Sequence, residues 1–215
     1  MAKEAVERGI FDVLKDTGAV ITDSHFVYTS GKHGSVYVNK DAVYPHTKEA
    51  SRIGELFAER VKDLDIDVVV GPALGGIILS QWTAYHLSEL KRKEILGVYT
   101  EKDANENQIF RRGYDRLVQE KNVLVVEDLT TTGGSVKKVV DSVRHAGGTV
   151  VAVGVMVNRD PENINEDTIG APFFALGILR AEAFDEKDCH LCKDRVPINT
   201  SVGHGRKYLE EKRRS

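Results

Sequence analysis

VLVVEDLTTTGGS, residues 123–135, is the stretch that decides the fold of this chain. Its first four residues are apolar, which predicts a short buried strand. Glu127 and Asp128 follow directly, and then a loop of hydroxyl-bearing residues and glycines leads into a helix. Such a loop can point several backbone N–H groups at one phosphate, and glycine lets the backbone approach the phosphate oxygens closely. The two carboxylates would then lie one sugar-length away, where they can accept hydrogen bonds from ribose hydroxyls.

Two common nucleotide-binding motifs do not match this stretch. It lacks the lysine of GxxxxGK[ST], and it is not GxGxxG. A purely structural interpretation is a strand followed by a helix start that Thr or Ser caps. The two acids directly after the apolar strand favour ligand binding instead, with hydroxyl donors from Thr131, Thr132 and Ser135.

Similar apolar runs occur on both sides of this stretch. They predict further strands at 66–70, 95–99, 149–157 and 173–177, and helical periodicity predicts helices at 4–16, 48–62, 76–90 and 135–145. Residues 26–38 predict two short strands around a glycine-rich turn. Apolar strands alternating with helices predict an α/β fold with a mostly parallel sheet covered on both faces. Ligands of such sheets bind beyond the carboxyl ends of the strands.

The composition is that of a globular protein. Of its 215 residues 41% are hydrophobic and 29% charged, and the formal net charge is -3. This balance gives no reason to expect nucleic acid or an anionic membrane as a partner. No apolar run is long enough to cross a bilayer, and the start of the chain lacks the apolar segment of a secretory signal. Both cysteines fall in one CxxC, so the reducing cytoplasm is the expected compartment.

The stretch at 123–135 resembles the phosphoribosyl pyrophosphate motif of type I phosphoribosyltransferases, with Thr130 at a place that is usually aliphatic. Over nearly the whole chain the pattern resembles the orotate phosphoribosyltransferase family. Three segments carry this likeness: the strand and turn at 26–32 (FVYTSGK), the loop at 71–76 (GPALGG) and the pair Asn158-Arg159. In that family the first segment helps cover the base, the second contacts pyrophosphate and the arginine meets orotate.

The resemblance implies a fold, a reaction and a set of site residues. The fold is the type I phosphoribosyltransferase fold, one domain over 1–215 with a small hood from residues 1–45 and about 173–215. The reaction transfers the phosphoribosyl group of phosphoribosyl pyrophosphate to orotate, with Mg²⁺, in a homodimer. Thr131 and Arg159 would contact orotate, and Asp128 would hold Mg²⁺ indirectly. The phosphoribosyl pyrophosphate site would comprise Glu127, Asp128, Leu129, Thr130, Thr131, Thr132, Gly133, Gly134, Ser135, Lys102 and Gly75.

Two features concern the leaving group. Polar residues 100–114 fall where the family has a mobile catalytic loop, and a long loop in a compact domain is often a lid. Lys102 is the candidate catalytic cation there, although solvated hairpin charges are an equally good interpretation. Some family members place lysines where Thr29 and Gly75 stand in this chain, so other cations or Mg²⁺ must neutralise more of the pyrophosphate charge.

Arg159 has a physical argument of its own. Orotate carries a carboxylate and two ring carbonyls, and an arginine fork suits such a planar array of acceptors. Arg159 follows a predicted core strand, so it should point into the site. The alternative is a surface arginine paired with Asp160 or Glu162.

The sequence Cys189-His190-Leu191-Cys192 is half of a zinc-site pattern. A structural Zn²⁺ held by Cys189 and Cys192 needs four ligands. His204 is a candidate third ligand, His190 is awkwardly placed between the cysteines, and a dimer could supply four thiolates. A tight turn with two free thiols is the simpler interpretation.

Two rival functions remain open from the sequence. The first is a phosphoribosyltransferase of the same fold that uses a purine or another base. The second is a non-catalytic regulatory protein that senses phosphoribosyl pyrophosphate.

Overall fold

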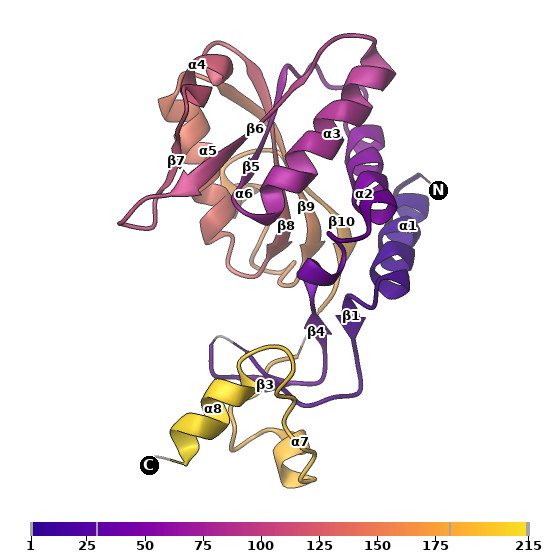
Figure 1. Cartoon of the computed structure of the whole chain (residues 1–215), viewed down its shortest axis with the longest axis vertical. Coiled ribbons are helices and arrows are strands. Elements are labelled where there is room, and N and C mark those ends of the chain that lie inside the picture. The colour runs from indigo at the N-terminus through magenta and orange to yellow at the C-terminus, as the bar shows by residue number, and fades with distance from the viewer. Residues whose placement is uncertain (1, 29, 181, 214–215) are drawn as a thin grey trace.

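The computed structural model describes residues 2–28, 30–180 and 182–213, with side chains from residue 9 onwards. Thr29, where the sequence lacks an expected lysine, lies outside these residues. Figure 1 shows a large α/β lobe and a smaller lobe that contains β3, α7 and α8, with β1 and β4 between them. No helix in the described part of the chain is long and apolar enough to cross a membrane.

The large lobe is built on a six-stranded sheet in the order β10-β9-β8-β5-β6-β7. All neighbouring strands are parallel except β6 and β7, which form an antiparallel hairpin. The predicted parallel sheet is thereby confirmed. The strands are β5 (Val68–Pro72), β6 (Leu96–Lys102), β7 (Gln108–Phe110), β8 (Asn122–Thr130), β9 (Thr149–Asn158) and β10 (Phe173–Ile178).

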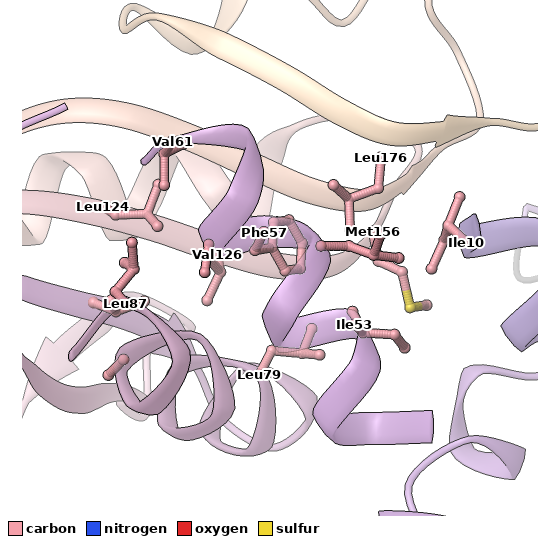
Figure 2. Close-up of a cluster of buried hydrophobic side chains, with 14 of the residues drawn as sticks. Ile10, Ile53, Phe57, Val61, Leu79, Leu87, Leu124, Val126, Met156 and Leu176 are labelled. Atoms are coloured by element: carbon pink, nitrogen blue, oxygen red, sulfur yellow. The ribbon is translucent and has the colours of Figure 1, made fainter. Parts of the chain in front are cut away.

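Helices cover both faces of this sheet. The first three helices pack on one face and the next three lie on the other. They are α1 (Ala2–Asp16), α2 (Thr47–Arg60), α3 (Gly75–Lys91), α4 (Tyr114–Val118), α5 (Gly134–His145) and α6 (Glu166–Ile169). Side chains of a strand alternate between faces, so each apolar strand supplies both cores. In β8, Leu124 and Val126 face α2 and α3, whereas Val123 and Val125 face α5. Figure 2 shows the first of these cores, in which Phe57 and Leu79 of the helices and Leu124 and Val126 of β8 are labelled.

The small lobe joins two segments that are far apart in the sequence. β2 (Phe26–Val27) pairs with β3 (His33–Gly34), and single bridges link His25 to Ile198 and His33 to Phe184. The lobe is completed by α7 (His190–Lys193) and α8 (Gly205–Lys212). β1 (Val20–Ile21) and β4 (Tyr37–Val38) pair above it, and a short 3-10 helix, η1 (Lys40–Ala42), follows β4. We call this small lobe the hood.

The hood segments are shorter than residues 1–45 and 173–215. α1 contributes Ile10 and Leu14 to the first core, and β10 is the edge strand of the main sheet. Both elements therefore belong to the large lobe, because their apolar side chains are buried there. The hood begins after β1 on the N-terminal side and after β10 on the C-terminal side.

Of the two interpretations of residues 100–114, a mobile loop or a hairpin with solvated charges, the structure has the hairpin, which ends at Phe110. β6 continues to Lys102 and β7 returns from Gln108. The Asp103 carboxylate accepts hydrogen bonds from the backbone N–H groups of Asn105 and Asn107, both at 2.8 Å. An aspartate that bonds its own backbone in this way closes a tight turn. The polar composition therefore marks a hairpin turn rather than an irregular segment.

Candidate active site

The candidate site lies at the carboxyl edge of the sheet, beyond the ends of β5, β8 and β9. Because the strands are parallel, the residues that follow them meet at this edge. Gly75 follows β5, the acidic pair and the threonine loop end β8, and Arg159 follows β9. The backbone N–H of Arg159 donates to the carbonyl oxygen of Thr130 at 3.0 Å. This bond joins the end of β8 to the residue that follows β9.

The loop after β8 has the form of a phosphate cradle. Thr130 is buried, and its hydroxyl accepts a hydrogen bond from the backbone N–H of Gly133 at 3.1 Å. Gly133 has a φ of 72°, a conformation that glycine adopts without strain. The helix α5 begins at Gly134, so the N–H groups of its first turn have no partner within the helix. Thr131, Thr132 and Ser135 are exposed beside them.

Thr130 thus has a role that its sequence position does not reveal. The family motif usually has an aliphatic residue there, and a packed methyl group is the simplest expectation for threonine. In the structure its hydroxyl also closes the loop onto Gly133. The neighbouring Leu129 is partly buried and packs against the first core. Thr130 thus fixes the loop by a hydrogen bond, and Leu129 anchors it by packing against the core.

Asp128 is almost fully buried, with 1% of its surface exposed, and two partners hold its carboxylate. The Nζ of Lys40 donates to both oxygens, at 3.1 and 2.8 Å, and the hydroxyl of Tyr44 donates to Oδ2 at 2.9 Å. Burial alone would lower the pKa of Lys40, but the Asp128 carboxylate outweighs burial and the pKa is raised. Burial and the same carboxylate raise the pKa of Tyr44. Lys40 is therefore charged and Tyr44 neutral at physiological pH.

Glu127 differs from its neighbour in protonation. Burial raises its pKa to about 8, and the Asp128 carboxylate adds to the shift. Its Oε1 accepts a hydrogen bond from the backbone N–H of Asp128 at 2.9 Å. Near neutral pH Glu127 therefore keeps its proton, while the Asp128 carboxylate forms its ion pair with Lys40. One acid can then donate a hydrogen bond while the other accepts.

Glu127→Gln should change the pH dependence of stability. Folded Glu127 keeps its proton up to about pH 8, whereas an unfolded glutamate releases it near pH 4.5. The folded state is the more protonated one between these values, so this group makes the free energy of unfolding fall as pH rises through that window. Glutamine resembles the protonated acid and does not titrate. The variant should be more stable than the parent at about pH 8.5 by a few kcal/mol, at about 1.4 kcal/mol per pKa unit.

Urea denaturation at about pH 5 and about pH 8.5 measures this difference. The two proteins should nearly coincide at the lower pH. Glu94→Gln, at an exposed glutamate, is the control and should leave the profile unchanged. Equal stability differences at both pH values for Glu127→Gln would contradict the raised pKa.

Gly75 lies directly against the acidic pair. A Cβ at this position would be 2.0 Å from Oδ2 of Asp128 and 2.4 Å from the hydroxyl of Tyr44. A lysine here, as in some members of the family, could not coexist with this arrangement. The adjacent Leu74 is 82% exposed, whereas Gly75 itself is buried. A residue with a side chain at position 75 would collide with the Asp128 carboxylate and the Tyr44 hydroxyl, which explains why glycine stands there in this chain.

Arg159 and the hood residue Tyr28 form a second part of the site. The guanidinium carbon of Arg159 lies 4.8 Å from the centre of the Tyr28 ring, a cation–π contact. Arg159 forms no ion pair among the described residues, and its buried Nε has no hydrogen-bond partner there. The carboxylate of Glu162 instead pairs with Arg180, and that of Asp160 bonds Asn163. The alternative of a surface arginine paired with either acid is therefore wrong.

Lys102 lies on the β6–β7 hairpin, and its ion pair is with Glu106 rather than with Glu127 or Asp128. Its Nζ lies 3.4 Å from Oε1 of Glu106, and both side chains are exposed. Arg111 and Arg112 both pair with Glu101 of the same hairpin. Within the part of the chain that the structure describes, none of these cations contacts Asp128. Their contribution to catalysis remains a prediction.

The two cysteines form part of a four-residue cluster in the hood. Cys189 and Cys192 lie with His25 and His33, and the candidate ligand atoms are all within 4.8 Å of one another. His204 and His190, which the sequence places near the cysteines, are not members of this cluster. The two histidines that lie beside the cysteines, His25 and His33, come from the N-terminal segment instead.

Sequence reasoning missed the residues that complete the site from other segments. Lys40 and Tyr44 lie in a stretch without clear periodicity, VNKDAVYPH at 38–46. The one available signal was physical: a buried carboxylate needs a cation or hydrogen-bond donors. That requirement does not say which lysine of the chain supplies the charge.

Known proteins resemble this chain over most of its length. Residues 39–169 match the family model of the phosphoribosyl transferase domain. The orotate phosphoribosyltransferase of Caldanaerobacter subterraneus is 35% identical over 92% of this chain and 96% of its own. That of Thermotoga maritima is 36% identical over 92% and 100%, respectively.

Solved structures show the same fold. Orotate phosphoribosyltransferase from Mycobacterium tuberculosis is 25% identical, with a TM-score of 0.63 over 80% of this chain and 97% of the other. The enzyme from Aeropyrum pernix is 27% identical, with a TM-score of 0.59 over 78% and 92%.

Proposed function

The chain belongs to the phosphoribosyltransferase family, as a member of its orotate phosphoribosyltransferases, and from this premise we propose how its residues perform the reaction. The enzyme transfers the 5-phosphoribosyl group from phosphoribosyl pyrophosphate to orotate, giving orotidine 5'-monophosphate and pyrophosphate in pyrimidine biosynthesis. One observation carries the assignment of roles. The acidic pair, the phosphate cradle and Arg159 meet at Thr130, whose carbonyl accepts from the N–H of Arg159.

The 5-phosphate binds in the loop of residues 131–135. The N–H groups at the start of α5 have no partner within the helix, and the exposed Thr131, Thr132 and Ser135 supply hydroxyls in the same loop. The ribose hydroxyls bind Asp128 and Glu127. Asp128 is an acceptor, and Glu127 keeps its proton near neutral pH and can donate as well as accept. The sugar is thereby held at both ends.

Arg159 orients the base. Its unpartnered Nε and the Tyr28 ring beside it are suited to a planar anion, because a guanidinium presents several donors in one plane. Thr131 lies in the same loop, next to the carbonyl that bonds Arg159. A base held here by its carboxylate and ring carbonyls places one ring nitrogen toward the sugar.

The reaction is a direct displacement at the anomeric carbon. The bond from that carbon to pyrophosphate breaks while the bond to the ring nitrogen forms, and positive charge develops on the sugar ring. The negative Asp128 stabilises that charge, and binding holds the reacting atoms together. Lys40 lies 2.8 Å from the oxygen of Asp128 that faces Gly75, so it places a positive charge beside the pyrophosphate loop.

Mg²⁺ fits the donor set of this site. Asp128 carries a carboxylate, the ligand type this ion prefers, but Lys40 and Tyr44 bind its oxygens. Phosphates of the substrate would therefore supply most of the ligands. When bound, Mg²⁺ would neutralise part of the negative charge of pyrophosphate. Because Lys40 already occupies Asp128, we propose that Asp128 acts on the ion through water or hydroxyl groups.

The hairpin of residues 100–110 is the proposed lid. Its basic side chains are exposed and held by acids of the same hairpin, which leaves Lys102 accessible to pyrophosphate. We propose that the enzyme is a homodimer in which each hairpin reaches the site of the neighbour. We place it in the cytoplasm, where two free thiols persist.

Release of pyrophosphate tests the function. Purified protein with phosphoribosyl pyrophosphate and Mg²⁺ should release pyrophosphate with orotate, and much more slowly with adenine, hypoxanthine or uracil. Those bases lack the carboxylate that Arg159 would bind. Faster turnover with adenine or hypoxanthine would show that the enzyme uses a purine rather than orotate as its base. Binding of phosphoribosyl pyrophosphate without turnover of any base would support a sensing protein instead.

A further inference from the structure

The hood contains a cluster of metal-ligating side chains that the transferase reaction does not use. His25 Nε2 lies 2.8 Å from His33 Nδ1, 3.8 Å from Cys189 Sγ and 3.7 Å from Cys192 Sγ. Cys192 Sγ lies 3.3 Å from His33 Nδ1. Three of the four side chains are buried, with Cys192 partly so. Two nitrogens and two sulfurs thus converge on one point.

These distances match the edges of a zinc tetrahedron. With Zn–N of about 2.0–2.1 Å and Zn–S of about 2.3 Å, the edges are about 3.3 Å for two nitrogens, about 3.6 Å for nitrogen and sulfur and about 3.8 Å for two sulfurs. The four separations each lie within about half an ångström of the matching edge, and the two other pairs of ligand atoms lie within 4.8 Å. The CxxC spacing is also the spacing that zinc sites use for a cysteine pair.

A backbone contact outside the cluster prepares His25 for coordination. Its Nδ1 lies 2.8 Å from the carbonyl oxygen of Val196, which can only accept a hydrogen bond. The proton of the neutral ring is therefore on Nδ1, and the lone pair of Nε2 points at the cluster. Ligating histidines are oriented in this way by a partner on the other ring nitrogen.

The hood is separate from both large hydrophobic cores, and it has few buried apolar side chains of its own, among them Phe26, Val27 and Tyr28. Among the described residues, neither hydrophobic cluster includes a member from 21–41 or 180–213. Its longest helix, α8, has 8 residues. Small lobes with so little buried apolar surface are usually stabilised by disulfides or metal ions. The four side chains join the segment at 25–34 to the tail at 185–196, where such a link is needed.

We propose that His25, His33, Cys189 and Cys192 bind one structural Zn²⁺ that ties the C-terminal tail to the N-terminal hairpin. The ligand atoms are Nε2 of His25, Nδ1 of His33 and the two Sγ atoms. All four positions are filled by protein, so the ion has no open site for catalysis. Tyr28 lies between the two histidine ligands in the sequence and contacts Arg159. The ion therefore also fixes the part of the hood that faces the base.

Metal analysis of the full-length protein tests this site without reference to activity. Protein made in zinc-containing medium, or loaded with ZnCl₂ and desalted, should retain about one zinc per chain. Replacing zinc by Co²⁺ should give the intense visible bands of a tetrahedral site and a sulfur-to-cobalt charge-transfer band. Cys192→Ser and His33→Ala should lose the metal, whereas His190→Ala and His204→Ala should keep it.

The wild-type protein provides a second measurement, since the variants could fail to fold. Removing zinc with a chelator should make the hood sensitive to protease, and adding ZnCl₂ should restore resistance while the large lobe stays intact. Less than about 0.1 zinc per chain after loading would overturn the proposal. Full zinc retention by Cys192→Ser would also overturn it. So would a disulfide between Cys189 and Cys192 in protein purified under reducing conditions. Loss of zinc from His190→Ala or His204→Ala would refute the assigned ligand set.

Discussion

Asp128→Asn is expected to lower kcat/KM for phosphoribosyl pyrophosphate by about a thousandfold or more, which is about 4 kcal/mol of transition-state stabilisation. Asparagine has nearly the same shape but carries no charge, and its amide nitrogen cannot accept a hydrogen bond. The variant loses the negative charge beside the developing cation of the sugar and one acceptor for the ribose hydroxyls. Steady-state rates of pyrophosphate release with orotate measure the effect.

The pairing with Lys40 needs its own control, because Asp128→Asn also leaves that ammonium without its carboxylate. A double variant, Asp128→Asn with Lys40→Met, removes the unpaired charge. It should remain inactive if Asp128 acts on the substrate. Recovery of activity in the double variant would show that the unpaired lysine caused the loss.

Asp65→Asn is the matched control for the loss of a carboxylate. Asp65 is exposed, pairs with Lys93 and precedes β5, at the opposite edge of the sheet. It should keep full activity. Circular dichroism should be the same for all single variants, whereas Asp128→Asn should melt at a lower temperature because Lys40 loses its buried partner. More than about a tenth of the parent activity in Asp128→Asn would remove this residue from the proposed mechanism.

Arg159→Ala is expected to lower kcat/KM for orotate by about a hundredfold to a thousandfold, or about 3–4 kcal/mol. The guanidinium would make charge-assisted hydrogen bonds to the acceptors of orotate, and such bonds are about twice as strong as neutral ones. The contact between Arg159 and Thr130 is a backbone bond and survives the substitution. The KM for phosphoribosyl pyrophosphate should therefore change little.

Two further variants separate charge from geometry. Arg159→Lys keeps the positive charge but loses the planar fork, so it should recover only a small part of the activity. Arg60→Gln is the control, because Arg60 also lies over an aromatic ring, that of Phe174, but on α2. It should behave like the parent. Equal increases in KM for both substrates in Arg159→Ala would mean that this arginine binds the phosphate end rather than the base.

The sequence alone determined the large lobe and the centre of the site. Strand and helix patterns can be seen in a short stretch of sequence, because the spacing of apolar residues along it reflects which side chains are buried. A strand whose alternate side chains enter opposite cores is apolar throughout. This is why β5, β8 and β9 could be predicted, and with them the edge where ligands bind. The acids and the threonine loop are contiguous within residues 123–135, and Arg159 follows the next strand. Contiguity made these residues recognisable.

Only the tertiary structure decided which distant residues complete the site and the hood. Lys40 is 88 residues from the carboxylate it holds, and His25 is 164 residues from Cys189. No periodicity marks either contact, because each depends on which segment closes over a sheet edge or packs against the tail. A buried charge or a lone CxxC requires partners, but several lysines and histidines of the chain would satisfy that requirement. Long-range packing selects among them, and it is decided by the whole chain rather than by any local stretch.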